Sequence, residues 1–368
     1  MAHALQLAAR GLNSTRPNPR VGCVIVRDGE VVGEGWHQYA GGPHAEIVAL
    51  EQAGARARGA SCFVTLEPCS HRGRTGPCST ALIEAGVARV VAAIEDPNPR
   101  VAGDGMKAIR DNGIAAEVGL LARAAAALNK GFLQRMRDGR PYVRAKLGVT
   151  LDGRIAAADG GSQWITSAAA RADVQRLRAQ SCAIVTGIDT VLADDPKLNV
   201  RAADLAASMR EQPLRVVLDS RLRLPPTAGM LKLPGRTLVI TGRIATEIAA
   251  FKAEGAEVIP VGLDGAHLDL GAVMAELARR EINEVLIEAG PRLTGALLMA
   301  GLVDELICYL APKLLGGDAR AMLEMKGLRS LDQALALEIE DMRMVGPDLR
   351  LTIKPTPGPA GSGPGGQN

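Results

Sequence analysis

Three short motifs constrain this chain most, because they hold the residue types of a metal site yet lie far apart in the sequence. The motifs are Pro43-His44-Ala45-Glu46, Glu67-Pro68-Cys69 and Gly76-Pro77-Cys78. One imidazole and two thiols are common zinc ligands, and three protein ligands leave one position open, whereas a structural zinc has four. The fold must bring these motifs together, and the set predicts a catalytic metal centre.

The order His-x-Glu followed by Pro-Cys is typical of zinc nucleobase deaminases, which hydrolyse a C–NH2 group. Zn2+ held by His44, Cys69 and Cys78 would lower the pKa of bound water to about 7, so that hydroxide is present at neutral pH. Glu46 closely follows His44, so near a helix start both side chains can face one pocket. We interpret Glu46 as the general acid/base outside the metal shell.

Two other interpretations use the same residues. Buried cysteines are more often small core residues than ligands, and a closed structural zinc would take His71 as its fourth ligand. The second interpretation leaves Glu46 without a role, so the catalytic centre is favoured. Pro68 and Pro77 precede the two thiols, which predicts that both thiols lie at helix N-termini, where the helix dipole favours thiolate.

Length and composition indicate a two-domain enzyme. The chain has 368 residues, of which 47% are hydrophobic, enough for two cores. Its 43 basic and 40 acidic residues nearly balance and aromatic residues make up 2%, whereas nucleic-acid binders carry a basic face with stacking aromatics. We therefore expect a small-molecule substrate and no nucleic-acid partner.

Cysteine use and hydropathy indicate an intracellular protein. The six cysteines are scattered, which argues against a disulfide framework. No segment has the roughly eighteen apolar residues of a membrane span, and the N-terminal segment lacks a signal-peptide core. We expect a cytoplasmic protein with no membrane interaction.

Strands and helices alternate along the chain, which is typical of an α/β protein. A first domain is predicted over residues 1–140. Its expected elements are helix 2–11, hairpin strands 21–26 and 31–34, helix 44–58, strand 62–66, helix 78–85, strand 89–94, helix 103–112, a short strand near 116 and helix 122–137. The metal motifs then fall at the ends of strand–helix units, where open α/β sheets bind ligands.

A domain boundary is predicted near Arg137–Pro141, where Gly and Pro end a helix. A second alternating series fills residues 141–354. Its expected elements are strand 142–150, helix 167–180 and strands 183–186, 214–218, 237–240, 257–260 and 284–288. Residues 355–368 are mostly Pro, Gly, Ser and Ala without apolar periodicity, so we predict a disordered tail.

The segment Val285–Leu298 has the pattern of a strand, a glycine turn and a helix. Gly290 and Gly295 would let the backbone approach a phosphate, which the N–H groups at the helix start would bind. The segment matches neither a Walker P-loop nor the Rossmann Gly-x-Gly-x-x-Gly. Because many α/β turns use glycine for geometry alone, the segment by itself is weak evidence for a nucleotide site.

Longer motifs resemble the bifunctional deaminase/reductase family of riboflavin biosynthesis. In the first domain the resemblance covers Thr15–Val26, Pro43–Glu46, Val64–Cys78 and Glu95–Pro99. In the second it covers Lys146–Gly148, Leu151–Arg154, Ser162–Ser167, Thr190–Pro196 and Glu288–Pro291. It extends over about residues 1–353 and leaves out the tail.

The spacing of the cysteines agrees with this family. Cytidine and tRNA-adenosine deaminases have Cys-x-x-Cys, whereas eight residues separate Cys69 from Cys78. The intervening loop carries His71, Arg72 and Arg74, whose positive charge beside the metal suits a phosphorylated substrate. A merely solvated basic loop is the alternative.

The resemblance implies a cytidine-deaminase-like zinc domain, an α/β/α sandwich, followed by a dihydrofolate-reductase-like α/β domain. The first would release ammonia from 2,5-diamino-6-ribosylamino-4(3H)-pyrimidinone 5′-phosphate. The second would use NADPH to reduce the ribosyl side chain of 5-amino-6-(5-phosphoribosylamino)uracil to ribityl, with the hydride chemistry supplied by the cofactor. The implied cofactors are one Zn2+ per chain and NADPH.

The resemblance also implies the residues of the reductase site. The implied NADP contacts are Gly148, Trp164, Thr190, Asp194, Ser220, Gly290, Pro291, Arg292, Leu293, Thr294, Gly295 and Ala296. The implied substrate contacts are Ser162, Arg178, Leu198, Arg201 and Glu288. Arg178 and Arg201 can hold a phosphate by fork-like hydrogen bonds, and Ser220 with Arg221 can bind the 2′-phosphate of NADP. Alone, Arg178 would be interpreted as a solvated helix residue and Trp164 as a core aromatic.

Two other functions are open. One is a deaminase whose C-terminal half serves only substrate binding or dimerisation, and the other is a zinc-stabilised interaction protein. We also expect a homo-oligomer, either a dimer or a tetramer, assembled through the reductase domain. The apolar segments Thr294–Ala300 and Glu305–Ala311 are the candidate interface.

Overall fold

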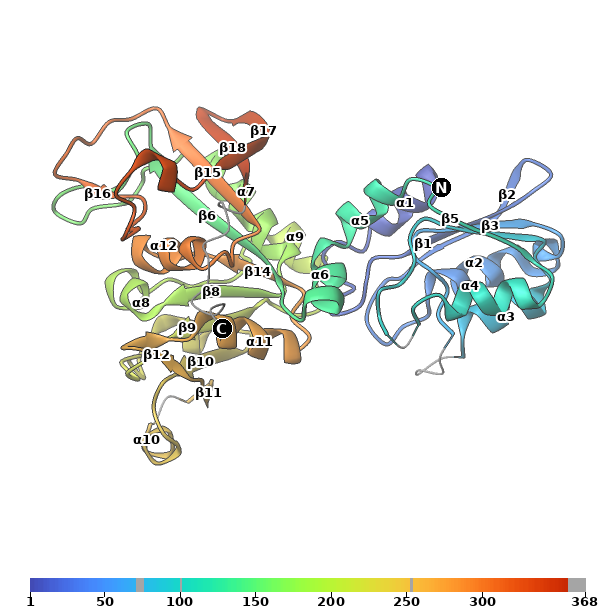
Figure 1. Ribbon diagram of the computed structural model, residues 1–368, viewed down its shortest axis with the longest axis horizontal. Coiled ribbons are helices and arrows are strands. Elements are labelled where there is room, and N and C mark those ends of the chain that lie inside the picture. The colour runs from blue at the N-terminus through green and yellow to red at the C-terminus, as the bar shows by residue number, and fades with distance from the viewer. Residues whose placement is uncertain (71–75, 100, 252–253, 357–368) are drawn as a thin grey trace, which may run out of the picture. The chain divides into compact units, whose positions relative to one another are not determined.

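The computed structural model describes residues 1–70, 76–99, 101–251 and 254–356 (Figure 1). The chain forms two compact units. One comprises Met1–Pro141 with Ser208–Arg210 and Glu281–Asn283, and the other comprises Tyr142–Ala207, Glu211–Arg280 and the residues from Glu284 onward. The predicted tail lies outside the described residues from position 357. No described helix is both long and apolar enough to span a membrane.

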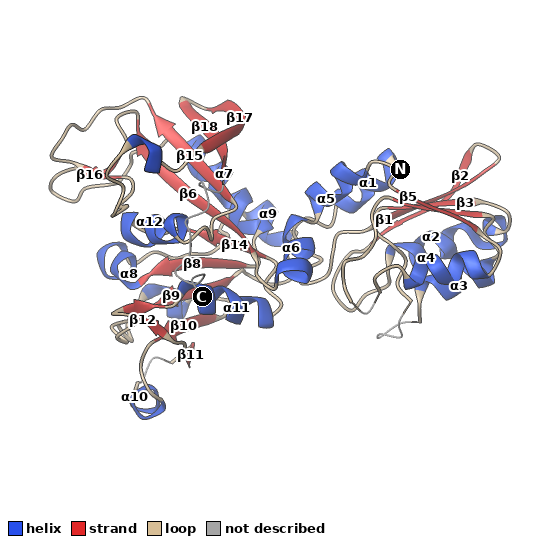
Figure 2. Cartoon of the chain, in the orientation of Figure 1, coloured by secondary structure: helices blue, strands red, loops and turns tan. Residues whose placement is uncertain are grey.

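The first unit is built on a five-stranded sheet with strand order β2-β1-β3-β4-β5 (Figure 2). Its strands are β1 (Gly22–Arg27), β2 (Glu30–Trp36), β3 (Ser61–Val64), β4 (Arg89–Ala92) and β5 (Ala115–Val118). Its helices are α1 (Ala2–Ala9), α2 (Ala45–Ala53), α3 (Cys78–Ala85), α4 (Asp104–Asp111), α5 (Ala122–Leu128) and α6 (Lys130–Asp138). Strand β1 is antiparallel to β2 and β3, and β3, β4 and β5 are parallel.

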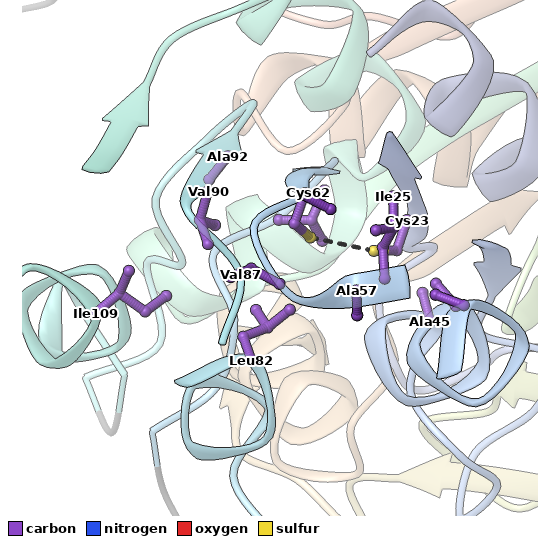
Figure 3. Packing of buried hydrophobic residues seen from close by; sticks show 14 of the residues in the cluster. Cys23, Ile25, Ala45, Ala57, Cys62, Leu82, Val87, Val90, Ala92 and Ile109 are labelled. Atoms are coloured by element: carbon purple, nitrogen blue, oxygen red, sulfur yellow. Dashed lines mark hydrogen bonds between the residues drawn. The ribbon is translucent and has the colours of Figure 1, made fainter. Parts of the chain in front are cut away.

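Alternating side chains of the central strands build two cores. Cys23 and Ile25 of β1 and Cys62 of β3 point to the face covered by α2, α3 and α4. Figure 3 shows Cys23 and Cys62 facing each other across the two strands, with 3.4 Å between their sulfur atoms. Val24 lies on the opposite face, where Leu7 of α1 covers it. Helices on both faces confirm the α/β/α sandwich.

Helix α2 lies directly on β2 because Gly35 has no side chain. A Cβ atom at Gly35 would lie 2.5 Å from the carbonyl oxygen of Ala45, a distance that real Cβ atoms do not reach. The close approach fixes the start of α2, which carries His44 and Glu46.

Two predicted helices are shorter than expected. The helix predicted over 122–137 is interrupted at Asn129, whose side chain accepts the backbone N–H of Arg20 at 2.8 Å and donates to the Arg20 carbonyl at 2.9 Å. The helix predicted over 44–58 ends at Ala53, because Gly54 has a φ of 52° and begins a short 3-10 helix. Contacts and backbone geometry therefore override helical periodicity at both points.

The second unit is built on a nine-stranded sheet with order β11-β10-β9-β8-β14-β6-β15-β18-β17. The sheet strands are β6 (Tyr142–Thr150), β8 (Ala183–Gly187), β9 (Leu214–Leu218), β10 (Thr237–Thr241), β11 (Ala256–Pro260), β14 (Glu284–Ile287), β15 (Glu305–Ala311), β17 (Leu337–Val345) and β18 (Asp348–Pro355). Neighbouring strands from β11 to β15 are parallel, whereas β15, β18 and β17 are antiparallel. The β17–β18 hairpin is absent from the sequence prediction.

Helices and small sheets complete this unit. The helices are α7 (Ala168–Gln180), α8 (Ile188–Asp194), α9 (Ala203–Ala207), α10 (Ala245–Ala250), α11 (Leu270–Arg279) and α12 (Pro291–Met299). The small paired strands are β7 (Arg154–Ala156) with β16 (Arg320–Ala321), and β12 (Leu263–Asp264) with β13 (His267–Leu268). The mostly parallel sheet with helical crossovers is the predicted α/β architecture.

Candidate functional site

The three predicted zinc ligands meet at the starts of two helices. His44 is the N-cap residue of α2, and Cys78 is the first residue of α3. The His44 Nδ1 lies 3.2 Å from the Cys78 Sγ and 3.6 Å from the Cys69 Sγ. Around a tetrahedral zinc with bonds of about 2.0 Å to nitrogen and 2.3 Å to sulfur, ligand atoms lie roughly 3.5–3.8 Å apart. The set therefore fits zinc, and no fourth ligand joins it among the residues that the structure describes.

Only one of the two thiols begins a helix. Cys69 lies in the loop after β3, so the prediction of a helix N-terminus is wrong for this residue. The start of α3 nevertheless reaches it, because the backbone N–H of Cys78 donates to the Cys69 Sγ at 3.4 Å. Hydrogen bonding from the Cys78 side chain and then from His44 lowers the pKa of Cys69 to about 4, and the same pairing raises the pKa of Cys78. A bound metal would displace the proton that the thiols share.

Glu46 lies in the first turn of α2, in the same pocket, and is only 3% exposed. Burial raises the pKa of its carboxyl to about 7, although the charge of His44 opposes this. It is not one of the three clustered ligand residues. A buried carboxyl group beside the ligands, outside their shell, is suited to moving protons.

A second histidine, which sequence reasoning missed, orients the first. The ring of His37 meets the ring of His44 edge-on, with centroids 5.4 Å apart. The Pro43 carbonyl lies 3.0 Å from the His37 Nδ1, and the Asn18 amide lies 3.0 Å from its Nε2. These partners assign the proton to Nδ1 of a neutral ring, and burial lowers the pKa of His37. His37 thereby holds the residue that precedes His44.

Glu67 is a buried carboxylate that organises the loop after β4. Its Oε2 accepts the backbone N–H groups of Asp96 at 3.1 Å and Gly103 at 3.0 Å, and its Oε1 accepts that of Met106 at 3.1 Å. Because Glu67 shares a short motif with Cys69, these bonds tie the loop and the start of α4 to the metal site. The motif that contains Glu67 does not by itself predict these hydrogen bonds.

We expect Glu67→Gln to lower both stability and deaminase turnover while zinc content stays unchanged. The amide keeps one acceptor oxygen, so a buried backbone donor loses its partner at a cost of roughly 1–3 kcal/mol. Thermal unfolding, zinc analysis and ammonia release measure the three effects. Glu84→Gln, which changes an exposed residue of α3, is the matched control. A melting temperature equal to that of the wild type would show that Glu67 does not stabilise the fold.

The second unit brings Arg178 and Glu288 together. The Arg178 Nε lies 2.6 Å from the Glu288 Oε1, and its Nη2 lies 2.9 Å from Oε2. Its Nη1 donates to the carbonyl of Asn199 at 2.9 Å. The Arg178 guanidinium fork, predicted to hold a phosphate, thus binds the carboxylate of Glu288. Arg201 is the more exposed of the two predicted arginines, with one 3.4 Å contact from its Nη1 to the Asn199 Oδ1.

Lys146 lies beside this ion pair and was not predicted as a site residue. The β6–β14 register places Ala145 opposite Ile287, so Lys146 follows next to Glu288. Burial lowers the pKa of Lys146, against the attraction of Glu288. Burial alone would raise the pKa of Glu288, but the charge and hydrogen bonds of Arg178 bring it down to about 2. The sequence carries a signal for Lys146, because this lysine lies in a predicted strand in which every second residue is apolar.

The glycine turn leads into α12 as predicted. Gly290 is the N-cap residue, and Pro291 is the first helical residue. A Cβ atom at Gly290 would lie 3.8 Å from the Thr190 hydroxyl, so α8 and α12 meet here. The buried hydroxyl of Thr294 has no hydrogen-bond partner among the described residues. Backbone N–H groups at a helix start fit the phosphates of a dinucleotide.

The other residues predicted to contact a ligand differ in whether their side chain or their backbone is accessible to it. The ring of Trp164 is 61% exposed and lies under the Arg171 guanidinium at 4.3 Å, so it is no core aromatic. Leu198 is buried in the core, which leaves its backbone for contact. A Cβ atom at Gly295 would lie 2.3 Å from the carbonyl oxygen of Glu324, so this glycine serves packing.

The remaining predicted residues lie on elements of the same unit. Gly148 lies in β6, Ser162 precedes Trp164, Asp194 ends α8, Ser220 follows β9, and Arg292, Leu293 and Ala296 lie in α12. His71, Arg72 and Arg74 of the long cysteine loop lie outside the described residues.

Known proteins resemble both units. The family described as RibD C-terminal domain matches residues 141–351, and the cytidine and deoxycytidylate deaminase zinc-binding region matches residues 1–94. The chain is 52% identical over 361 residues to the riboflavin biosynthesis protein RibD of Escherichia coli, covering 96% of this chain and 98% of the relative.

Solved structures agree with these matches. Acinetobacter baumannii RibD has a TM-score of 0.88 at 47% identity and covers 96% of this chain and 97% of its own. The diaminohydroxyphosphoribosylaminopyrimidine deaminase/5-amino-6-(5-phosphoribosylamino)uracil reductase of Thermotoga maritima has a TM-score of 0.85 at 31% identity and covers 97% of both chains.

Proposed function

The chain belongs to the RibD family of bifunctional riboflavin-biosynthesis enzymes, and from this premise we propose how its residues divide the two reactions. Residues 1–140 carry the hydrolytic deamination of 2,5-diamino-6-ribosylamino-4(3H)-pyrimidinone 5′-phosphate. Residues 141–354 carry the NADPH-dependent reduction of the ribosyl side chain of the product to ribityl. The observation that carries the proposal is the three-ligand set of His44, Cys69 and Cys78 beside the buried Glu46.

In the deaminase unit, side chains of the protein bind the metal and transfer protons. Bound Zn2+ supplies hydroxide at neutral pH by acidifying water. Glu46 accepts a proton at its carboxylate and delivers it to the departing amino group, so that the C–N bond breaks as ammonia leaves and a C–O bond replaces it. His37 keeps the Pro43 carbonyl, and with it His44, in place.

In the reductase unit the start of α12 binds the cofactor phosphates, and the Arg178–Glu288–Lys146 cluster binds the substrate. NADPH supplies the hydride. The reduction also takes up a proton, and the Lys146 ammonium next to Glu288 is placed to hold one at its Nζ. The pairing of Arg178 fixes both carboxylate oxygens of Glu288, so its position towards a substrate is set in advance.

The test is the product analysis of the purified chain with the diaminopyrimidine phosphate. Without NADPH we expect the deaminated compound and ammonia, and with NADPH the further reduced ribityl compound, both identified by mass spectrometry. A chain that releases ammonia but neither binds nor oxidises NADPH would support the deaminase-only alternative, which the match over residues 141–351 disfavours. Absence of both products overturns the proposal.

Coenzyme preference is a further expected property of this site. Ser220 follows β9, and its carbonyl accepts the N–H of Gly242 at 3.3 Å, so the ends of β9 and β10 meet there. The adjacent Arg221 is exposed. We expect Arg221→Ala to raise KM for NADPH about tenfold, the effect of one lost charge-assisted hydrogen bond of roughly 1.5 kcal/mol, and to leave KM for NADH unchanged. Steady-state kinetics with both coenzymes measure this.

Arg236→Ala is the matched control, because Arg236 is also exposed but precedes β10 at the opposite end of the sheet. A loss of equal size for NADH and NADPH would show that Arg221 does not contact the 2′-phosphate.

The proposal includes assembly and compartment. We propose a cytoplasmic homo-oligomer, a dimer or a tetramer, assembled through the reductase unit. Support for the compartment comes from the cysteines, since all six are described and all are free thiols. The phosphorylated small-molecule substrate also agrees with an intracellular enzyme.

A further inference from the structure

Two cationic side chains hold Trp164 in place, although most of this residue is open to solvent. Trp164 is 61% exposed, and the guanidinium carbon of Arg171 lies 4.3 Å from the centroid of its indole ring. The Arg171 Nη1 also donates to the carbonyl of Thr166 at 2.7 Å. The Lys313 Nζ donates to the Trp164 carbonyl at 2.8 Å. Contacts to both the ring and the backbone therefore fix an aromatic surface that a ligand can reach.

The positive charges beside this ring have no carboxylate partner. Helix α7 carries two other arginines, Arg176 and Arg178, and each of them forms an ion pair with a carboxylate. Within the part of the chain that the structure describes, Arg171 and Lys313 form no such pair. The protein therefore leaves positive charge next to the indole without neutralising it. A cation on one face of an aromatic ring leaves the other face free for a planar ligand ring.

The loop that carries Trp164 lies on β6 beside the cluster assigned to the substrate. A Cβ atom at Gly148 would lie 3.2 Å from the methyl carbon of Thr166, so the loop packs on this face of the strand. Lys146 precedes Gly148 by two positions, and alternate residues of a strand share one face. Lys146 is also close to Glu288, which attracts its charge. Trp164 therefore belongs to the end of the coenzyme site at which the coenzyme meets the substrate.

The nicotinamide ring is the part of the coenzyme that must approach the substrate, because the hydride passes from this ring to the substrate. The ring is neutral in NADPH, and the loss of a hydride leaves a pyridinium ring with one positive charge in NADP+. Stacked on the open face of Trp164, that charge would lie roughly 8 Å from the Arg171 guanidinium. At an effective dielectric constant of about 20, the repulsion weakens binding about thirtyfold. Screening by solvent and salt reduces the effect to about tenfold.

We propose that Arg171, together with Lys313, makes the reductase site bind reduced coenzyme in preference to oxidised coenzyme. Both are positioning residues, because they act through Trp164: they hold the indole on which the nicotinamide ring stacks, and their charge repels this ring once it has given up its hydride. The inference rests on the proposed reductase function. Its consequence is that NADP+ leaves the site readily and that fresh NADPH replaces it, so inhibition by the spent coenzyme is weak.

The test is the ratio of two dissociation constants of the full-length enzyme, that for NADP+ divided by that for NADPH, measured by isothermal titration calorimetry. We expect Arg171→Met to lower this ratio about tenfold, because the repulsion of the oxidised ring is lost. Arg171→Lys keeps the positive charge and should retain most of the ratio. The matched control is Arg176→Met, at an exposed arginine of the same helix, which should leave the ratio unchanged.

The outcomes separate this inference from the proposed function. A wild type that binds neither form of the coenzyme overturns the reductase function and this inference with it. Equal weakening of NADPH and NADP+ binding by Arg171→Met overturns only the inference, because a merely structural arginine would have that effect. A ratio that falls as far in Arg171→Lys also contradicts a role of the charge. If Arg171→Met does not fold, Lys313→Met, at an exposed position, provides an independent test: it should also lower the ratio, and an unchanged ratio contradicts the proposal.

Discussion

Glu46→Gln is expected to abolish ammonia release while the protein keeps one zinc ion per chain. The glutamine has nearly the same shape but cannot take up or deliver a proton, and general acid/base catalysis is worth roughly 100- to 10,000-fold in rate. His44, Cys69 and Cys78 are unchanged, so the metal site stays intact. The measurement pairs metal analysis of the purified variant with a coupled ammonia assay.

Two comparisons make this result specific. Glu51→Gln changes an exposed carboxylate on the same helix and should leave ammonia release unchanged. NADPH oxidation by the Glu46→Gln variant, when the deaminated intermediate is supplied, should equal that of the wild type. Full ammonia release by the variant would remove Glu46 from the mechanism.

The zinc site is the part that the sequence predicts best, because its residue types have few other reasons to occur in that order. The ligands His44, Cys69 and Cys78 converge as predicted, with Glu46 buried beside them. The motif does not predict the neighbouring residues that hold the ligands in position. His37 precedes His44 by a few positions, but its role depends on a ring contact and on the amide of Asn18, which only the fold brings together.

The strand at the sheet edge escaped prediction because of one irregularity. Apolar residues alternate at Leu337 and Ile339 and again at Met342 and Met344, but the two pairs are out of phase. The register shift between Ile339 and Asp341 inserts one extra residue and restores all four to one face. A period-two search over the sequence cannot see this, because it assumes an unbroken strand.

The break in helix 122–137 and the pairing of Arg178 with Glu288 could not be predicted for a different reason, which is distance along the chain. Hydrogen bonds between Asn129 and the Arg20 backbone interrupt the helix. The Arg178 side chain pairs with Glu288 and is not solvated in the way that its helix position alone would suggest. In both cases the partner lies about a hundred residues away in sequence, and local periodicity contains no information about it. The resemblance to known enzymes named Arg178 and Glu288 as neighbours of one substrate, but not as neighbours of each other.

The Arg178–Glu288 pair is expected to serve both folding and reduction, and substitutions can separate the two. Arg178→Met leaves Glu288 without its bidentate partner in a site where its side chain is 9% exposed. Removing one partner of a buried ion pair costs roughly 3–5 kcal/mol. We expect the second unit to unfold at lower denaturant concentration and NADPH oxidation to be lost, while ammonia release persists.

The pH dependence follows from the same pair. The pKa of Glu288 is about 2 in the folded protein against an ordinary value of 4.5, so the unfolded chain binds the proton more readily. The ionised pair therefore stabilises the fold above about pH 4.5, and this contribution is lost as the pH falls towards 2. Arg178→Met should flatten this part of the acid-unfolding curve, whereas Arg176→Met, at an exposed arginine of the same helix, should leave it unchanged.

A double variant separates the role of the ion pair in stability from its role in NADPH oxidation. Replacing both members by apolar residues, as in Arg178→Met with Glu288→Leu, removes the unpaired charge, and such replacements of buried ion pairs are often neutral or stabilising. We therefore expect the double variant to recover the unfolding midpoint and to remain inactive in NADPH oxidation, because the carboxylate that meets the substrate is gone. Recovery of both stability and reduction would mean that the pair only holds α7 against the end of β14, and that the substrate is bound elsewhere.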